Sequence, residues 1–226
     1  MARAVIIKQS IAVFLSAGLV LLGVFAFKER QYAWISMAIA LVSVLLVGMG
    51  YDHKQSHLRR TVLIAVMTGL SVMGRFLFAM VPGFKPMTAV IVLTGMYLGG
   101  EAGFLCGTFT AVLSNFYFGQ GPWTPFQMFA FGFLGLLAGV LARWLKKSVL
   151  LLCLYGVFAG ILYSAMMDIW TVLWSRETFE PAAYRAAVLA AIPFSAAYAV
   201  SNVIFLLLIR RPFGRKMNRM IRKYHV

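Results

Sequence analysis

The stretch SNFYFGQGPWTPFQM, residues 114–128, is the one long polar and aromatic interruption between two strongly apolar runs. Gly119 and Gly121 give its backbone freedom, and Pro122 and Pro125 stiffen the turn. Its side chains offer hydrogen-bond donors, acceptors and a flat indole ring, from Asn115, Gln120, Trp123, Thr124 and Gln127. Two interpretations follow: a stiff loop between two membrane helices, or the lip of a binding pocket.

Composition decides the class of protein around this stretch. Of the 226 residues, 62% are hydrophobic and only 12% are charged, and the mean hydropathy is +0.87. Such a chain has too little polar surface to cover a water-soluble globule, so the sequence predicts an all-α integral membrane protein of the cell membrane. Cys106 and Cys153 lie inside apolar runs and are interpreted as small core residues.

Eight apolar segments divide the chain, at residues 11–27, 32–51, 61–81, 87–98, 102–118, 124–144, 148–174 and 186–209. The fourth is short for a membrane span, and we expect a tilted or partly embedded helix that its neighbours shield. Small residues in the third segment (Ala65, Gly69) and in the sixth (Gly132, Gly135, Gly139) favour close helix packing.

The Lys and Arg residues indicate the orientation. If all eight segments cross and the N-terminus is inside, fifteen Lys and Arg residues fall on the inside and five outside. The positive-inside rule therefore predicts that both termini are cytoplasmic. The net charge of +15 is spread over short connections and the C-terminal tail, which favours membrane orientation and lipid contact rather than nucleic-acid binding.

Several polar residues lie near the outer ends of their apolar segments in this topology. Arg75, Asn115, Gln127 and Asp168 all fall within roughly the outer 10 Å of the membrane, at 1.5 Å per residue. Charged groups in hydrocarbon face a cavity or pair with one another, so Arg75 and Asp168 are the expected pair. That pair would act as a structural salt bridge or as direct ligand contacts.

The catalytic chemistries that we considered are not supported by the residues. No GxSxG or Walker motif is present, and His53, His57 and His225 all lie in connections. His53 and His57 have an i, i+4 spacing but lack a third metal ligand nearby. We therefore expect no enzymatic activity, no metal and no cofactor.

Four features together carry a family resemblance: a six-helix core that begins with the small-xxx-small helix, VPGFKP at residues 81–86, GGEAG at 99–103 and GQGPWTP at 119–125. On these features, residues 61–209 resemble the substrate-specific S component of energy-coupling factor (ECF) vitamin transporters. The resemblance implies a six-helix substrate-binding core at residues 61–210. The two-helix transmembrane extension expected at 1–60 departs from the family pattern, because it lies outside the usual six helices. A basic cytoplasmic tail is expected at 211–226.

The resemblance also implies the function. S components bind a vitamin from outside, dock on a transmembrane coupling protein driven by two cytoplasmic ATPases, and topple in the membrane to release the cargo. The matching docking ridge is Ala65 and Gly69. The lip is most similar to cobalamin-type members, which implies cobalamin or a related corrinoid, with riboflavin, queuosine, folate and pantothenate as alternatives.

The predicted substrate site combines the lip with the buried polar residues. Its first members are Asn115, Tyr117, Gln120, Trp123 and Gln127, and its further members are Arg75, Lys85, Tyr163 and Asp168. Trp123 would stack on a flat ring and the amides would hydrogen-bond its edge. Tyr198 and Asn202 either form the pocket floor or bond helix to helix. The competing class is a solitary secondary transporter or a lipid-modifying membrane enzyme.

Overall fold

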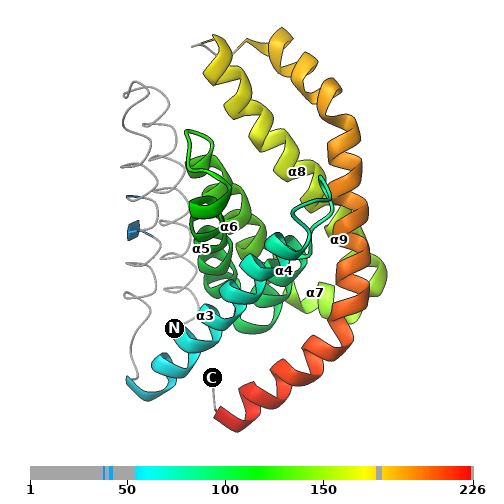
Figure 1. The fold of residues 1–226 in the computed structure, drawn as a ribbon. Helices are drawn as coiled ribbons and strands as arrows, with labels where there is room; N and C mark the ends of the chain where they lie inside the picture. Colours follow the sequence, from blue (N-terminus) through cyan, green and yellow to red (C-terminus); the bar gives the residue numbers. More distant parts are fainter. Residues whose placement is uncertain (1–37, 39–40, 43–53, 177–179, 225–226) are drawn as a thin grey trace.

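The computed structural model describes residues 38, 41–42, 54–176 and 180–224, and the elements in this part of the chain are all α-helices (Figure 1). In chain order they are α3 (Lys54–Leu77), α4 (Met87–Leu98), α5 (Gly100–Phe118), α6 (Thr124–Val140), α7 (Ala142–Lys147), α8 (Val149–Arg176) and α9 (Pro181–Tyr224). The all-helical prediction is confirmed for these residues. The predicted segments 11–27 and 32–51 lie outside the described residues, apart from three positions.

The short fourth segment is α4, and its predicted bounds match the observed helix. Twelve residues rise only about 18 Å, well short of the roughly 30 Å hydrocarbon core. Every residue of α4 except Tyr97 is buried, and the helix packs against α3, α5, α6 and α9. Its neighbours therefore shield it, as expected for an apolar helix too short to span.

Glycines bring α5 and α6 into close contact. A Cβ placed on Gly103 would collide with the backbone of Gly135, and a Cβ on Gly135 would collide with the backbone of Gly103. Gly132 faces Thr108 and Phe104 in the same tight way, and Gly139 faces Gly100. The packing role predicted for the glycines of the sixth segment is confirmed.

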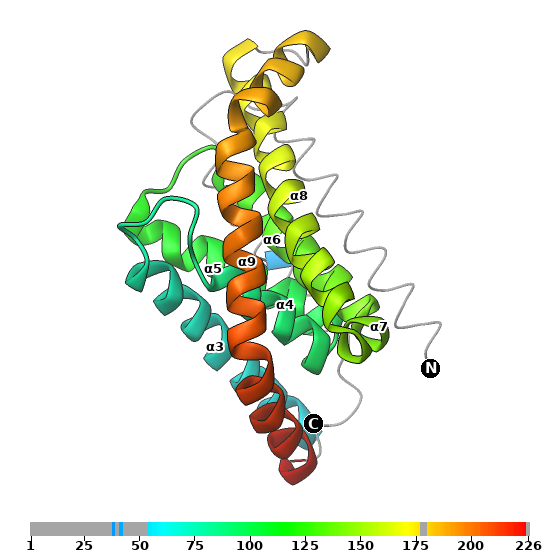
Figure 2. The ribbon, with the colours of Figure 1, turned by 90° about the vertical axis from the view of Figure 1, so that its right-hand side faces the viewer.

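Helices α8 and α9 form a long antiparallel pair on one side of the shorter helices (Figure 2). Their 28 and 44 residues correspond to about 42 and 66 Å. By length and hydropathy, α3, α8 and α9 are the described helices that qualify as membrane spans.

The last helix extends beyond both ends of the apolar segment 186–209. α9 continues to Tyr224 and includes both Pro193 and Pro212. The basic tail is therefore helical, and it packs on the bundle: Phe213 contacts the ring of Tyr97 at 6.0 Å between centroids, and Met217 is 2% exposed.

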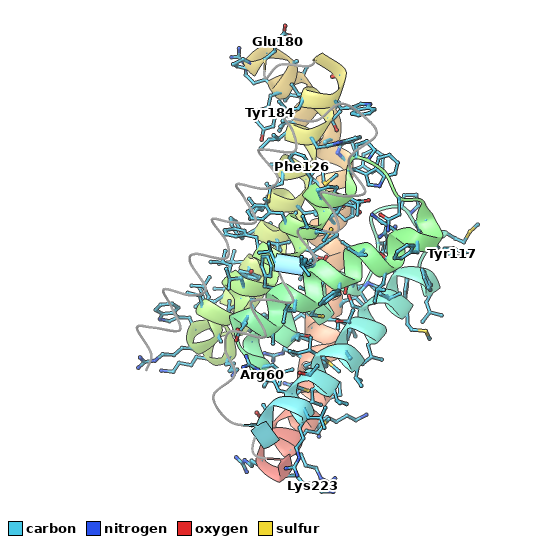
Figure 3. All side chains as sticks on the ribbon, turned by 90° about the vertical axis from the view of Figure 1, so that its left-hand side faces the viewer. Arg60, Tyr117, Phe126, Glu180, Tyr184 and Lys223 are labelled. Atoms are coloured by element: carbon cyan, nitrogen blue, oxygen red, sulfur yellow. The ribbon has the colours of Figure 1, made fainter. Side chains whose placement is uncertain are left out.

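The two ends of the described bundle differ in charge. Most of the basic residues in the described part of the chain lie at one end, hereafter the basic end. They come from the N-terminal turns of α3, from α7 and from the end of α9. There Arg60 pairs with Glu101 at 3.3 Å and also donates to the carbonyl of Leu98 at 3.2 Å. Figure 3 shows Arg60 and Lys223 toward this end and Glu180 toward the opposite one.

Candidate functional site

Four helices contribute side chains to one connected set of hydrogen bonds. The Arg75 network, as we name it, comprises Arg75 from α3, Ser114 and Asn115 from α5, Thr124 and Gln127 from α6, and Tyr163 from α8. Ser114, Asn115 and Thr124 are each 0% exposed. The predicted topology placed a polar residue from each of these four helices at one level, with Asp168 as the residue from α8. In the structure Tyr163, not Asp168, joins α8 to the network.

Asn115 is the centre of the network. Its Oδ1 accepts a hydrogen bond from Arg75 Nη1 at 2.7 Å. Its Nδ2 donates to Thr124 Oγ1 at 3.0 Å and to Gln127 Oε1 at 2.9 Å. Both ends of the amide are thus engaged, which fixes its orientation in the buried interior.

The network extends from the amide to α8. Gln127 Nε2 donates to Tyr163 Oη at 3.2 Å, and the ring of Tyr163 stacks on Phe131 at 4.4 Å. Tyr163 also meets Tyr198 of α9 edge to face at 5.2 Å. Aromatic rings therefore pack beside the polar groups of the network.

The lip folds back so that the start of α6 meets the end of α5. Gly119 has φ 101°, a conformation that glycine adopts without strain, and it ends α5. Thr124 then closes the turn, since its N–H donates to the Gly121 carbonyl at 2.9 Å and its Oγ1 accepts from the Gly121 N–H at 3.3 Å. This turn places Gln127 against Asn115.

Arg75 has neutral partners, and the predicted pair with Asp168 is wrong. Its guanidinium donates to Ser114 Oγ and Asn115 Oδ1 and lies 4.7 Å over the ring of Phe118. Among the residues that the structure describes, the ion pair is Arg60–Glu101. Within this part of the chain, no carboxylate pairs with the positive charge beside the lip.

A second cation lies across the same ring. Lys85 Nζ is 5.8 Å from the centroid of Phe118, and the Lys85 backbone is held by Ser201, whose Oγ accepts from its N–H at 2.8 Å. Burial lowers the pKa of Lys85, and the positive charge of Arg75 lowers it further. Lys85 thus lies next to the Arg75 network without joining it.

Three tryptophans form a cluster near the lip. Trp123 meets Trp170 of α8 edge to face at 5.8 Å, and Trp170 stacks with Trp174 at 6.2 Å. Trp170 Nε1 is buried and has no hydrogen-bond partner, the one such side-chain atom among the described residues. A buried donor without a partner is destabilising, so this N–H is a candidate for a ligand contact.

One family model matches this chain. It is described as ECF-type riboflavin transporter, S component, and it matches residues 55–218. The chain belongs to the ECF-type S-component family. No curated protein and no solved structure gives a significant match. S components bind a vitamin-like substrate and couple to an ECF module of a transmembrane coupling protein and ATPases, so the family is a transporter component rather than an enzyme.

Three predicted site residues of the S component lie apart from the network. Tyr117 is 76% exposed and contacts Phe76 at 5.0 Å, and Figure 3 shows it at the edge of the molecule. Gln120 is exposed, and its Nε2 donates to the Val112 carbonyl at 3.1 Å. Asp168 is partly exposed on α8. Of the predicted site residues, the structure therefore joins Arg75, Asn115, Gln127 and Tyr163 by hydrogen bonds.

The last helix of the S component supplies packing contacts instead of a polar floor. Asn202 Nδ2 donates to the Gly156 carbonyl at 3.1 Å, which joins α9 to α8. Helix-to-helix bonding, one of the two interpretations of Asn202, is confirmed.

Sequence reasoning missed Trp170, Trp174 and Phe118 as neighbours of the site. Trp170 and Trp174 have an i, i+4 spacing near the outer end of the 148–174 segment. That spacing places both on one helix face and was the available signal. Phe118 directly precedes the lip, but nothing in the sequence shows that two cations flank its ring.

The predicted docking ridge is on the open side of α3. Ala65 and Gly69 are both exposed, and a Cβ on Gly69 would meet nothing within 4 Å among the described residues. Their exposed neighbours on the same face are apolar: Val62 (53%), Val66 (49%), Leu70 (50%) and Met73 (56%). The ridge is therefore small in side-chain volume and apolar at its borders.

Proposed function

We propose that this S component captures a vitamin with a flat ring at the Arg75 network and delivers it to an ECF module. The observation that supports this most directly is the half-buried Arg75, which donates to Ser114 and Asn115 and has no carboxylate partner among the described residues. Charged groups at membrane depth mark ligand pathways because their desolvation is otherwise unfavourable. The network supplies the polar contacts and the tryptophans supply the apolar wall, the usual division in a small-molecule site.

The network favours a ligand whose edge carries hydrogen-bond acceptors. Arg75 has donors beyond the two in use, and Trp170 Nε1 has none in use. An acceptor-rich edge would satisfy both, and the ring face would lie against Trp123 or Trp170. Riboflavin has this chemistry in its isoalloxazine ring and is named in the description of the matching family model. We therefore place it first among substrates.

Cobalamin or a related corrinoid is the second candidate. The likeness of the GQGPWTP lip to cobalamin-type S components supports it. A corrinoid also has a flat macrocycle with acceptor side chains, but it needs a much wider mouth. The two substrates differ in size, since binding of cobalamin would require the lip at residues 119–123 to move away from Trp170 and Trp174.

We further propose that binding occurs at the outer face and docking through α3. The basic end of the bundle would then be cytoplasmic, in accordance with the positive-inside rule, and the Arg75 network lies toward the opposite ends of α3 and α5. The exposed Ala65 and Gly69 would allow a helix of the coupling protein to approach α3 closely. Both termini would be cytoplasmic, and two ATPases would supply the energy.

Titration of the purified protein tests the proposal. Tryptophan fluorescence is recorded while riboflavin, cobalamin, folate, pantothenate or queuosine is added. We expect one of the first two to quench the signal at submicromolar concentration. In Trp123→Phe the quenching should shrink and the dissociation constant rise, whereas Trp144→Phe, at the basic end and 55% exposed, should leave the constant unchanged. Equal effects of the two variants would contradict a site at the lip.

Copurification separates an S component from a self-sufficient protein. The proposed subunit should pull down a coupling protein and two ATPases, and in liposomes it should not accumulate substrate without them. Substrate accumulation by the chain alone would favour the solitary secondary transporter.

A further inference from the structure

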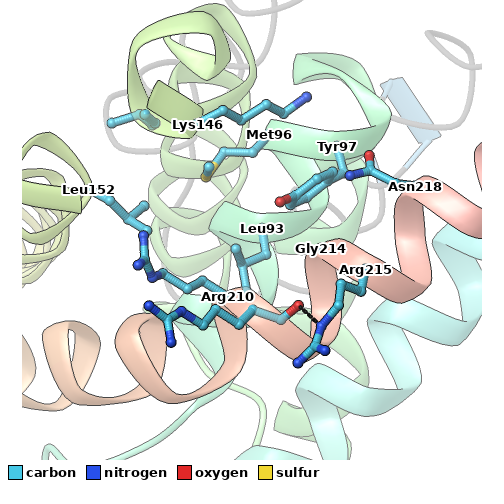
Figure 4. A pocket seen from close by; sticks show the side chains of 11 residues that line it. Leu93, Met96, Tyr97, Lys146, Leu152, Arg210, Gly214, Arg215 and Asn218 are labelled. Carbon is cyan, nitrogen blue, oxygen red and sulfur yellow. Dashed lines mark hydrogen bonds between the residues drawn. The ribbon is translucent and has the colours of Figure 1, made fainter. Parts of the chain in front are cut away.

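A cavity of about 270 Å³ lies at the basic end, away from the Arg75 network. It is formed where the end of α4, α7, the start of α8 and the C-terminal half of α9 meet (Figure 4). Its apolar lining comes from Leu93, Met96, Leu145 and Leu152, which are 0 to 4% exposed. It shares no residue with the site proposed for the vitamin.

Four cations line this cavity: Lys146, Arg210, Arg211 and Arg215. None of the described residues in its lining is acidic, and Glu101 at the same end is paired with Arg60. Arg215 Nε donates to the Arg211 carbonyl at 3.5 Å, which uses one of the five N–H groups of that guanidinium. Like charges gathered without a counter-charge repel one another, so an anion would stabilise the arrangement.

Lys146 and Tyr97 form the opposite wall from the arginines, as Figure 4 shows. Lys146 Nζ lies 4.8 Å from the centroid of the Tyr97 ring, and burial lowers the pKa of this lysine. Gly214 of α9 faces Tyr97 so closely that a Cβ there would collide with Tyr97 Oη. The close approach of α9 to α4 holds the two cationic walls together.

The cavity lies where contact with membrane lipid is expected. Arg210 directly follows the apolar stretch of α9, at the level where a membrane helix passes into the headgroup region. Next to it, Leu207 and Leu208 are 41% and 66% exposed, and Leu150 on α8 is 69% exposed. An apolar outer surface thus leads up to a cationic hollow.

The size of the cavity limits the kinds of ligand that it can hold. Sites for drug-sized molecules occupy roughly 300 to 1,000 Å³, so this one suits a headgroup better than a nucleotide. We propose that it binds the phosphate of an anionic phospholipid such as phosphatidylglycerol, whose acyl chains lie along the exposed leucines of α8 and α9. Basic pockets between membrane helices favour such headgroups.

The test measures lipid affinity by native mass spectrometry of the protein in a neutral detergent. Phosphatidylglycerol, phosphatidylcholine and inorganic phosphate are titrated separately. The variant R210Q/R211Q/R215Q removes three cations of the cavity. The matched control, K216Q/R219Q/R222Q, removes the same charge from the same helix outside the cavity lining.

We expect the cavity variant to lower the affinity for phosphatidylglycerol by about 100-fold and the control by less than about threefold, because each cation near the headgroup contributes separately. Lys146→Gln, on a different helix, should lower it by about fivefold and guards against misfolding of α9 in the triple variant. Equal losses in the two triple variants would show general charge attraction and overturn the proposal. Inorganic phosphate that binds as tightly as the lipid would overturn it too, in favour of a free-phosphate site.

Discussion

Replacing Asn115 with leucine removes the centre of the Arg75 network with little change in side-chain size. Asn115 is 0% exposed and takes part in three hydrogen bonds, to Arg75, Thr124 and Gln127. In Asn115→Leu the half-buried guanidinium of Arg75 keeps only its hydrogen bond to Ser114, and the Gln127 Oε1 acceptor loses the bond from Asn115. Arg75 and Gln127 then each lack one hydrogen bond in a largely apolar environment.

The structure permits an estimate of the effect. A hydrogen bond to a charged group contributes ~1.5 to 3 kcal/mol. Bonds between neutral side chains of membrane helices average ~0.6 kcal/mol. One bond of the first kind and two of the second give a loss of about 3 to 4 kcal/mol. For a chain of this length, that corresponds to a fall in Tm of roughly 10 °C.

Asn202→Leu is the matched control. Asn202 is also buried, at 3% exposed, but it makes one described bond, to the Gly156 carbonyl at 3.1 Å. Its loss should lower Tm by only about 2 °C. Both variants are compared with the native protein by differential scanning fluorimetry, in one detergent and at one scan rate, because membrane proteins unfold irreversibly in many cases.

The ratio of the two Tm shifts shows whether Arg75 depends on Asn115. A fall in Tm for Asn115→Leu that is several times that for Asn202→Leu would support Asn115 as the centre of the network. Similar shifts for the two variants would refute the reasoning, since Arg75 would then not depend on Asn115.

Three further predictions concern substrate, docking and packing. Trp170→Phe removes the unpartnered Nε1 donor, so it should weaken vitamin binding about two- to tenfold without lowering Tm; an unchanged dissociation constant in the fluorescence titration would exclude that donor from the site. Ala65→Leu and Gly69→Leu should abolish uptake by the assembled transporter and spare binding, whereas Met73→Leu should spare both; normal uptake in the first two would reject docking through α3. Gly135→Ala should reduce the yield of folded protein because its Cβ collides with the Gly103 backbone, whereas Gly69→Ala should be neutral or raise Tm slightly; size-exclusion profiles that do not distinguish them would contradict the α5–α6 packing.

Sequence reasoning grouped the polar residues at one level but did not predict which of them bond to one another. Counting residues from the helix ends brought Arg75, Asn115 and Gln127 to one level, and the structure bonds them together. The same counting suggested Asp168 as the partner of Arg75. Asp168 lies five residues past Tyr163, about 7.5 Å along α8 and about 140° around it. Tyr163 faces the network, and depth alone carries no information about which side of a helix faces inward.

The extent of α9 was underestimated for a different reason. Hydropathy falls at residue 209, and an apolar window detects only the part of a helix that lies in hydrocarbon. The residues that follow are mostly Arg, Lys and Met, which favour helix, and Phe213 and Met217 have the i, i+4 spacing of one packed face. The periodic signal was present, but it becomes interpretable only once α4 and α7 supply the surface that those residues cover.

One helix carries both halves of the proposed function. Arg75 lies six residues beyond Gly69, about 9 Å along α3, so the ligand contacts and the docking ridge belong to one rigid element. If a vitamin takes over the hydrogen bonds that Arg75 now makes to Ser114 and Asn115, the bonds between α3 and α5 weaken as the ligand binds. Any change in the position or tilt of α3 then moves Ala65 and Gly69 as well, because a helix transmits displacement along its axis. A ligand can change the docking affinity only if it binds the two positions of α3 with different affinities. The docking affinity of Asn115→Leu without vitamin should therefore approach that of the native protein with vitamin bound. A docking affinity that changes neither with the mutation nor with the vitamin would show that the ligand site and the docking ridge are not coupled.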